Sequence, residues 1–136
     1  MIGLAIRKQL LIPHEDPHLP GQPLIDSYGN GGFRFADMSH RGSILIVPSG
    51  VYAWPVSNMA SLKADDLSRV LNESDDVEIL LLGTGETLVP PTEAIRQIFR
   101  SRQIVIDPMS TGAAARTYNV LRAEERCVAA ALIAVA

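Results

Sequence analysis

Two short glycine-containing segments carry the residue types in this sequence best suited to bind a small ligand. Gly83-Thr84-Gly85 follows one apolar run, and Ser110-Thr111-Gly112 follows a second apolar run and precedes a predicted helix. In α/β sheets, the loops that leave the carboxyl ends of buried strands commonly line the pocket. We therefore treat the two segments as one candidate site.

The segment at Ser110–Gly112 has the features of an anion site. Free backbone N–H groups, two hydroxyls and the positive end of a helix can hold a small anion or a carboxylate, and Arg116 adds charge one turn later. The alternative is structural: Ser110 or Thr111 caps the helix, and Gly112 permits close packing. Both interpretations stay open at this stage, and the structural one is favoured. The candidate ligand-binding residues are Gly83, Thr84, Gly85, Ser110, Thr111, Gly112 and Arg116.

A nucleotide site at Gly83–Gly85 is disfavoured by the residues that follow it. A dinucleotide fingerprint requires a third glycine where this chain has Leu88. The next helix starts only after Pro90-Pro91, too late to direct its N-terminus at a pyrophosphate. A tight turn after a buried strand explains both glycines. The sequence therefore predicts no cofactor.

The candidate metal and catalytic motifs lack the local structure or the neighbouring residues that their chemistry requires. The segment His14–His18 matches H-E-x-x-H as text, but Pro17 lies inside the helix that this zinc motif requires. Ser49 lacks the G-x-S-x-G turn, and no nucleophile lies beside a base in the sequence. We therefore predict no metal site and no catalytic residue, which favours a binding protein over an enzyme.

Composition describes an ordinary globular chain of 136 residues, 47% of them hydrophobic and 20% charged. A net charge of -3 argues against a nucleic-acid partner, because binding to nucleic acid requires a basic protein surface. The single cysteine, Cys127, excludes an intramolecular disulfide. The apolar segment Cys127–Ala136 is about half as long as a membrane-spanning helix. We expect a soluble cytoplasmic protein without a transmembrane segment; its oligomeric state is open.

The pattern predicts one domain over residues 22–136. Residues 1–21 are expected to form an irregular lead-in, open to partial disorder, because prolines interrupt it. Leu24–Tyr28 and Phe33–Ala36 flank Asn30-Gly31, a strong hairpin signal, so this hairpin should lie at an edge or on one face of the sheet.

From residue 43 onward, predicted strands and helices alternate, which indicates an α/β fold with a largely parallel sheet. The expected strands are residues 43–47, 77–82, 104–106 and 128–135, with a short one at 51–54. The expected helices are residues 63–74, capped by Ser61, 91–101, with Pro91 first, and about 111–122. Asn119 is a weak helix former, which predicts a hydrogen bond to a neighbouring loop.

Several of these segments together resemble the Mth938-like family, once catalogued as a domain of unknown function. The resemblance covers about residues 22–136 and is carried by Leu82–Gly85, Asp107–Ala114, Arg116–Leu121 and Glu124–Ala130, with Tyr28-Gly29, Phe33, Phe35 and Ile46–Pro48. Its most specific part is Thr117-Tyr118-Asn119 in a helix after a small-residue turn.

The resemblance implies a three-layer α/β fold whose central sheet is mixed, with one strand opposing the rest. Eukaryotic members are assembly factors for respiratory complex I that act through protein partners, and the family has no agreed catalytic residues. It thus implies a non-enzymatic protein-binding domain that assists assembly of a membrane complex, held beside the inner membrane by its partners. The alternative is a small-ligand or anion-binding protein or enzyme with its pocket between Gly83–Gly85 and Ser110–Gly112.

Overall fold

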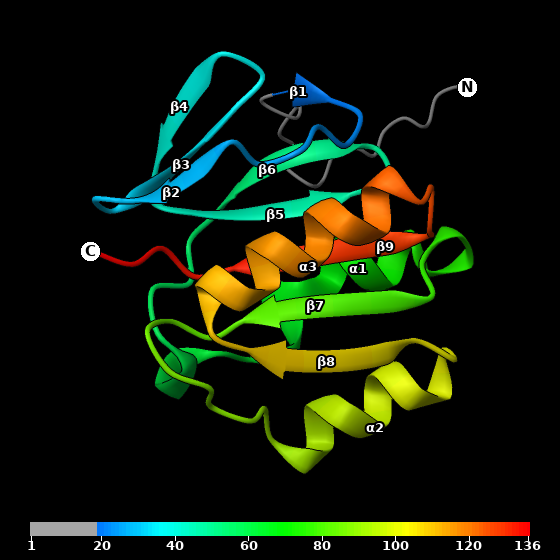
Figure 1. The fold of residues 1–136 in the computed structure, drawn as a ribbon. Helices are drawn as coiled ribbons and strands as arrows, with labels where there is room; N and C mark the ends of the chain where they lie inside the picture. The colour runs from blue at the N-terminus through cyan, green and yellow to red at the C-terminus, as the bar shows by residue number, and fades with distance from the viewer. Residues whose placement is uncertain (1–18) are drawn as a thin grey trace, which may run out of the picture.

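The computed structural model describes residues 19–136, which form three layers (Figure 1). A six-stranded mixed sheet lies in the middle. One of its faces is covered by α3 and a separate three-stranded sheet, and the other by α1, α2 and short 3-10 turns. The segment His14–His18, whose zinc-motif interpretation the sequence rejects, lies outside the described residues, as does most of the predicted lead-in; Leu19 and Pro20 of that lead-in form an edge strand of the main sheet.

The elements have the following bounds. The strands are β1 Leu19–Pro20, β2 Ser27–Gly29, β3 Gly32–Phe35, β4 Met38–Arg41, β5 Ser43–Val47, β6 Gly50–Trp54, β7 Ile79–Gly83, β8 Val105–Met109 and β9 Val128–Leu132. The α-helices are α1 Ser68–Asn72, α2 Glu93–Ser101 and α3 Thr111–Ala123. The 3-10 turns are η1 Met59–Ser61, η2 Ala64–Leu67 and η3 Ser74–Asp76.

The main sheet has the strand order β1-β6-β5-β9-β7-β8. Parallel pairing joins β9, β7 and β8, whereas β5 is antiparallel to both of its neighbours. Among the five longer strands, β5 therefore runs against the other four, which confirms the mixed sheet that the family resemblance implies. The short strand β1 pairs at the outer edge, where a proline such as Pro20 is tolerated.

The middle of the main sheet is buried on both faces: every residue of β9 is buried, and so are the last four residues of β7. Leu80 and Leu82 point into the core on the side of α1 and α2, to which Phe99 of α2 contributes. Leu81 points into the second core, on the side of α3. There Ala130 of β9 leaves room for the fully buried Tyr118 of α3.

The predicted hairpin is confirmed as β2 and β3, joined by Asn30-Gly31 with φ angles of 52° and 82°. Phe33 and Phe35 are buried under it. A third strand, β4, follows and was not predicted, because the turn before it, Ala36-Asp37, lacks glycine although both residues have positive φ. The three strands form a small sheet beside α3, above the β5 and β6 side of the main sheet (Figure 1).

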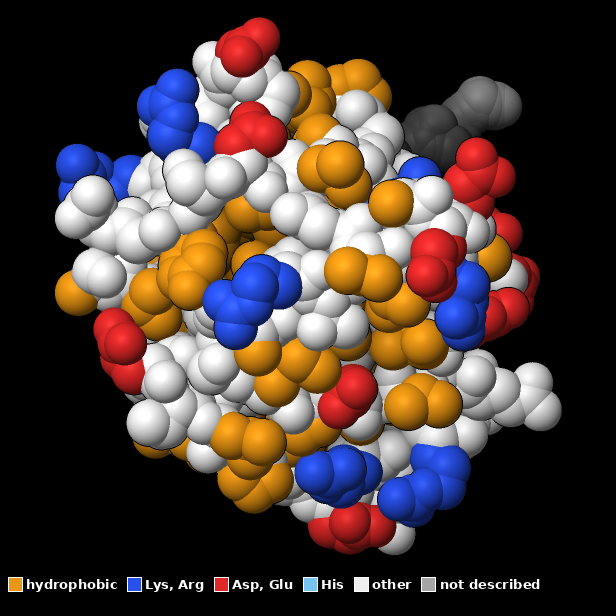
Figure 2. Space-filling view, viewed as in Figure 1, with side chains coloured by type: hydrophobic (Ala, Val, Ile, Leu, Met, Phe, Trp, Pro, Cys, Tyr) orange, Lys and Arg blue, Asp and Glu red, His pale blue; other side chains and the backbone are white. Residues whose placement is uncertain are grey.

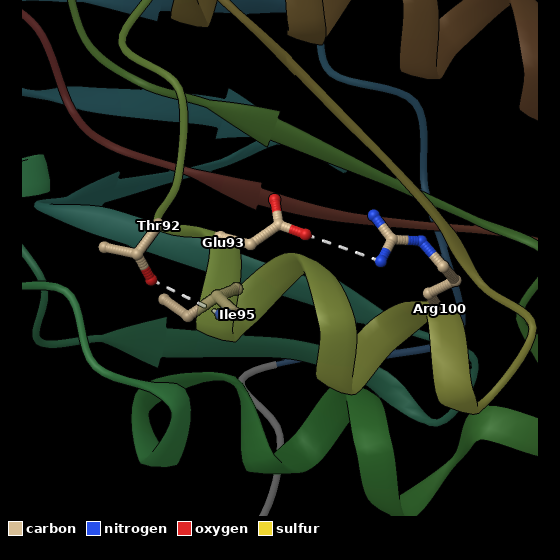
Figure 3. A network of polar contacts seen from close by, with 4 residues as sticks. All are labelled: Thr92, Glu93, Ile95 and Arg100. Carbon is tan, nitrogen blue, oxygen red and sulfur yellow. Dashed lines mark hydrogen bonds and ion pairs between the residues drawn. The ribbon is translucent and has the colours of Figure 1, made fainter.

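Two predicted helix starts were wrong. Ser61 ends η1, and the side chain of Asn58 accepts a hydrogen bond from its N–H at 3.0 Å. The predicted helix at residues 63–74 is instead η2, α1 and η3 in succession. Helix α2 begins at Glu93 and not at the predicted Pro91, and Thr92 caps it: the Thr92 hydroxyl accepts the N–H of Ile95 at 3.3 Å (Figure 3). A hydroxyl at this position satisfies an N–H that proline leaves exposed.

The last predicted strand ends early. Strand β9 stops at Leu132, although the apolar run continues to Val135. Beyond β9 the chain turns toward the small sheet, where the carbonyl of Val135 accepts the N–H of Gly31 at 2.8 Å. The last residues therefore connect the main sheet to the small sheet instead of extending β9.

Candidate functional site

The two glycine-containing segments meet where β7 ends and α3 begins. The N–H of Thr84 donates to the carbonyl of Met109 at 2.9 Å, and the N–H of Thr111 donates to the carbonyl of Gly85 at 2.9 Å. Parallel pairing of β7 with β8 places their carboxyl ends side by side, which explains the meeting. We call residues 83–85 and 110–112 the loop junction.

Thr111 is the central tie of the loop junction. Its side chain is fully buried, its hydroxyl accepts the N–H of Gly85 at 3.0 Å, and the same hydroxyl donates to the carbonyl of Ile133 at 2.7 Å. One side chain thus joins the loop after β7, the start of α3 and the segment after β9. This hydroxyl serves the fold, because both of its contacts are internal.

Thr84 organises the loop that follows β7. Its hydroxyl donates to the carbonyl of Thr87 at 2.6 Å and accepts the N–H of Val89 at 2.9 Å. The side chain is buried, so these contacts replace water as partners. The glycine-threonine pattern therefore builds a self-contained turn.

The three glycines of the loop junction have different reasons to lack a side chain. A Cβ on Gly83 would lie 2.9 Å from Cδ2 of Leu132 and 3.1 Å from Cα of Thr111, so close packing requires glycine there. Gly85 has a φ of +111°, which favours glycine. A Cβ on Gly112 would overlap the ring of Tyr28, which covers this side of the first turn of α3.

The remaining two predicted site residues divide between a cap and the surface. The sequence offered Ser110 and Thr111 as caps of α3, and the structure shows that Ser110 is the cap. Its hydroxyl accepts the N–H of Ala113 at 3.4 Å. Arg116 is exposed on α3. Within the described residues, no hydrogen bond or ion pair joins Arg116 to the loop junction.

An open groove of about 570 Å³ lies beside the loop junction, and Ser110 is not among its lining residues. Thr84 and Gly85 form one wall of it; the others come from the segment before and within η1 and from the segment after β9. The lining residues are Ser57, Asn58, Met59, Ala60, Thr84, Gly85, Glu86, Val89, Ile133, Ala134, Val135 and Ala136. Among these, Glu86 carries the single ionisable side chain. The groove is thus suited to apolar side chains and backbone, and of the seven predicted residues it includes Thr84 and Gly85.

The Tyr118–Asn119 pair of α3 has the structural role that the sequence predicts for Asn119. The amide of Asn119 accepts the N–H of Ile25 at 2.8 Å and donates to the carbonyl of Ile25 at 2.8 Å. The hydroxyl of Tyr118 donates to the carbonyl of Pro23 at 2.8 Å. Burial raises the pKa of Tyr118 well above its usual range, so this hydroxyl stays protonated. The pair fixes the chain as it enters the small sheet.

Two features escaped sequence reasoning. Ser49 donates to the carboxylate of Glu73 through its hydroxyl at 2.6 Å and its N–H at 2.9 Å, which ties the turn between β5 and β6 to the end of α1. The outer face of the small sheet forms a hollow of about 450 Å³ that includes Arg34 and Arg41. Residues 38–41, Met-Ser-His-Arg, show no alternation of apolar and polar residues, so the sequence carried no clear signal for that face.

Two features are absent from residues 19–136. No helix in this range is long and apolar enough to span a bilayer. No three His, Cys, Asp or Glu side chains in the same range lie close enough together to hold a metal ion.

Comparison with known proteins places the fold in a defined group. Residues 25–133 match the family described as "Protein of unknown function (DUF498/DUF598)". The crystal structure of a Bartonella henselae protein described as an outer membrane protein superposes with a TM-score of 0.85 at 55% identity, covering 88% of this chain and 100% of that one. The solution structure of a Bordetella pertussis protein described as an Mth938-like domain superposes with a TM-score of 0.73 at 26% identity, covering 82% and 85%. The Mth938-like architecture predicted from the sequence is confirmed.

Two relatives indicate how the chain compares in sequence. An uncharacterized protein of Rhodobacter capsulatus is 35% identical over 118 residues, which cover 87% of this chain and 90% of that protein. NADH dehydrogenase (ubiquinone) 1 alpha subcomplex assembly factor 3 of Drosophila melanogaster is 31% identical over 113 residues, which cover 81% of this chain and 58% of that protein. This chain thus spans less than two thirds of the assembly-factor relative.

Proposed function

Since the chain belongs to the DUF498/DUF598 family of proteins of unknown function, we propose that it is a non-enzymatic protein-binding domain that assists assembly of a membrane-bound respiratory complex. The similarity to the Drosophila melanogaster assembly factor carries this proposal, because it extends over 81% of the chain. In this proposal the domain works in the cytoplasm and reaches the inner membrane through its partners.

The groove beside the loop junction supports the binding part of the proposal. Its walls include the side chains of Met59 and Val89, and Val89 is 39% exposed. Leu88, the neighbouring residue, is 57% exposed but does not line the groove. Apolar walls on a rigid, hydrogen-bonded frame are suited to the side chains of a partner segment. We propose this groove as the contact for the partner.

The test combines deletion with capture. In cells that make this chain, deletion should lower the amount of assembled complex I on native gels, and cross-linking of the tagged full chain should capture complex I subunits. Val89→Glu should reduce capture because it places a charge in the groove, whereas Leu88→Glu should retain it. Intact complex I in the deletion strain, with no subunit captured, contradicts the proposal.

A small-ligand function is the second candidate, and the groove volume of about 570 Å³ is the observation that favours it. Because direct hydrogen bonds join the two loops, the ligand would lie beside Gly85 and not between the loops. A nuclear magnetic resonance screen of small carboxylates and phosphates should then shift the amide of Gly85. If that amide responds to no compound while the capture experiment succeeds, the partner-binding function stands alone.

A further inference from the structure

The outer face of the small sheet carries two arginines with nothing acidic opposite them. Register places Arg34 of β3 directly between Ser27 of β2 and Ser39 of β4. Arg41 lies two pairs along, opposite Gly32, and therefore on the same face of the sheet. These residues are exposed apart from Gly32, and we call Ser27, Arg34, Ser39 and Arg41 the cationic face.

The floor between the arginines is bare backbone. Gly29 pairs with Gly32 across β2 and β3, so no side chain rises from that pair. A Cβ on Gly32 would lie 3.1 Å from Cα of Arg41, and the carbonyl of His40 is nearer still, so packing excludes a larger residue. The result is a hollow of about 450 Å³ whose lining includes Arg34 and Arg41.

The charges of this face are not neutralised within residues 19–136. Arg34 donates to the hydroxyl of Ser39, and neither Arg34 nor Arg41 forms an ion pair with a described residue. No Asp or Glu lines the hollow. Figure 2 shows Lys and Arg side chains over the small sheet at the upper left, with acidic side chains near them but apart from the lining. The face therefore presents guanidinium donors that a carboxylate fits.

The spacing of the arginines selects the shape of the ligand. Arg34 and Arg41 are diagonal neighbours on adjacent strands, positions that lie about 7–8 Å apart. Alternate residues of an extended peptide point to the same side and are separated by roughly 6.6 Å. Two carboxylates at positions i and i+2 of such a peptide would meet the two guanidinium groups, while the glycine floor admits its backbone.

We propose that the cationic face binds an extended acidic segment of a partner protein, with carboxylates at alternate residues. This inference rests on the proposed function, because it names the chemistry of a second contact with the partner. The net charge of -3 disfavours an extended polyanionic surface such as nucleic acid or an anionic bilayer, whereas a short acidic segment contacts this face alone.

In the test, the ¹⁵N-labelled full chain is titrated with the peptide Thr-Glu-Thr-Glu-Thr-Glu-Thr, and binding is measured from the changes in backbone amide chemical shifts. The amides of Gly29, Gly32 and Ser39 should move, and the affinity should fall as salt is added. Neutralising both arginines, with Arg34→Gln and Arg41→Gln together, should weaken binding by about tenfold or more.

Arg100→Gln is the matched control, because it lowers the charge near α2, in the layer on the other face of the main sheet, where Arg100 pairs with Glu93 at 3.5 Å (Figures 1 and 3). It should change the affinity by less than about twofold. Equal weakening by Arg100→Gln, equal binding of a peptide with Gln in place of Glu, or shifts confined to other residues would each overturn the proposal.

Two further measurements separate this proposal from its competitors. If inorganic phosphate or phosphatidylglycerol vesicles bind the two arginines and the peptide does not, the peptide site is wrong. If the double arginine variant still captures complex I subunits as well as the unaltered chain does, the cationic face is not a partner contact, although the assembly function survives. Reduced capture by the double variant, with Arg100→Gln unaffected, supports both.

Discussion

The loop junction and the cationic face use their polar residues in opposite ways. In the loop junction, the hydroxyls of Thr84 and Thr111 are buried, and each both donates and accepts within the protein. On the cationic face, Arg34 and Arg41 are exposed, and within residues 19–136 their side chains form one hydrogen bond, which Arg34 donates to Ser39. Groups whose bonds are filled internally stabilise the fold, and groups with open donors remain for a ligand.

The largest expected effect comes from the tie at the centre of the loop junction. Thr111→Val keeps the shape of the side chain but leaves the N–H of Gly85 and the carbonyl of Ile133 without this partner. Unfolding in urea should show a loss of about 2–4 kcal/mol, since each buried unsatisfied group costs about 1–3 kcal/mol. Thr117→Val is the matched control in the same helix, because among the described residues the Thr117 hydroxyl has a single, weak partner, the sulfur of Met109 at 3.6 Å. An equal loss in the free energy of unfolding in the two variants would show that the two hydrogen bonds of the Thr111 hydroxyl do not stabilise the fold specifically.

The next effect distinguishes Gly83 and Gly112, the two glycines of the loop junction at which an added Cβ would meet other atoms. Gly83→Ala should cost about 1–3 kcal/mol, because its Cβ would meet backbone and a fully buried leucine. Gly112→Ala should change stability by less than about 1 kcal/mol, because alanine favours the helix and Tyr28, at 42% exposed, has room to move.

The same urea measurement decides between these expectations, and Tyr28→Ser provides the check. If Gly112→Ala does lose stability through the Tyr28 ring, the added Tyr28→Ser change should restore it. A loss at Gly112 that exceeds the loss at Gly83, and that Tyr28→Ser does not restore, would mean that the start of α3 has a constraint other than this contact.

The sequence predicted the loop junction far better than the cationic face, for physical reasons. Continuous apolar runs such as Leu80–Leu82 indicate buried strands directly, and the glycines after them mark the turns. The polar strand β4 has no such signal, because Ala36-Asp37 is an uncommon pair for a turn with positive φ. The cationic face exists only once β4 pairs with β3.

The walls of the groove show a second limit of sequence reasoning. They join residues far apart along the chain, such as Met59, Gly85 and Ile133, and no local pattern predicts that they meet. By contrast, a local misfit at Asn119, a weak helix former inside α3, correctly predicted a tertiary hydrogen bond. A residue that breaks a local preference thus indicates a distant contact but not the partner in it.

A smaller effect, of opposite sign, is expected at the turn that builds the cationic face. Ala36 has a φ of 49°, a left-handed conformation that costs an ordinary residue about 1–2 kcal/mol. Ala36→Asn should therefore raise the free energy of unfolding by about 0.5–1 kcal/mol, because asparagine tolerates this conformation. Ala123→Asn, at the end of α3, should lower it slightly because asparagine is a weaker helix former. If both changes destabilise the protein, the turn is not strained in solution.

The smallest expected effect is the one that separates the two regions most clearly. Arg34→Gln and Arg41→Gln together should change the free energy of unfolding by less than about 0.5 kcal/mol, because both side chains are exposed and unpaired with any described carboxylate. We expect a slight increase in the free energy of unfolding, because the substitutions remove the repulsion between the two guanidinium groups. That increase should become smaller as salt is added. A loss above about 1 kcal/mol would assign the arginines a structural role, as in the loop junction. Stability that is unchanged while peptide binding is lost would separate folding from recognition on this face.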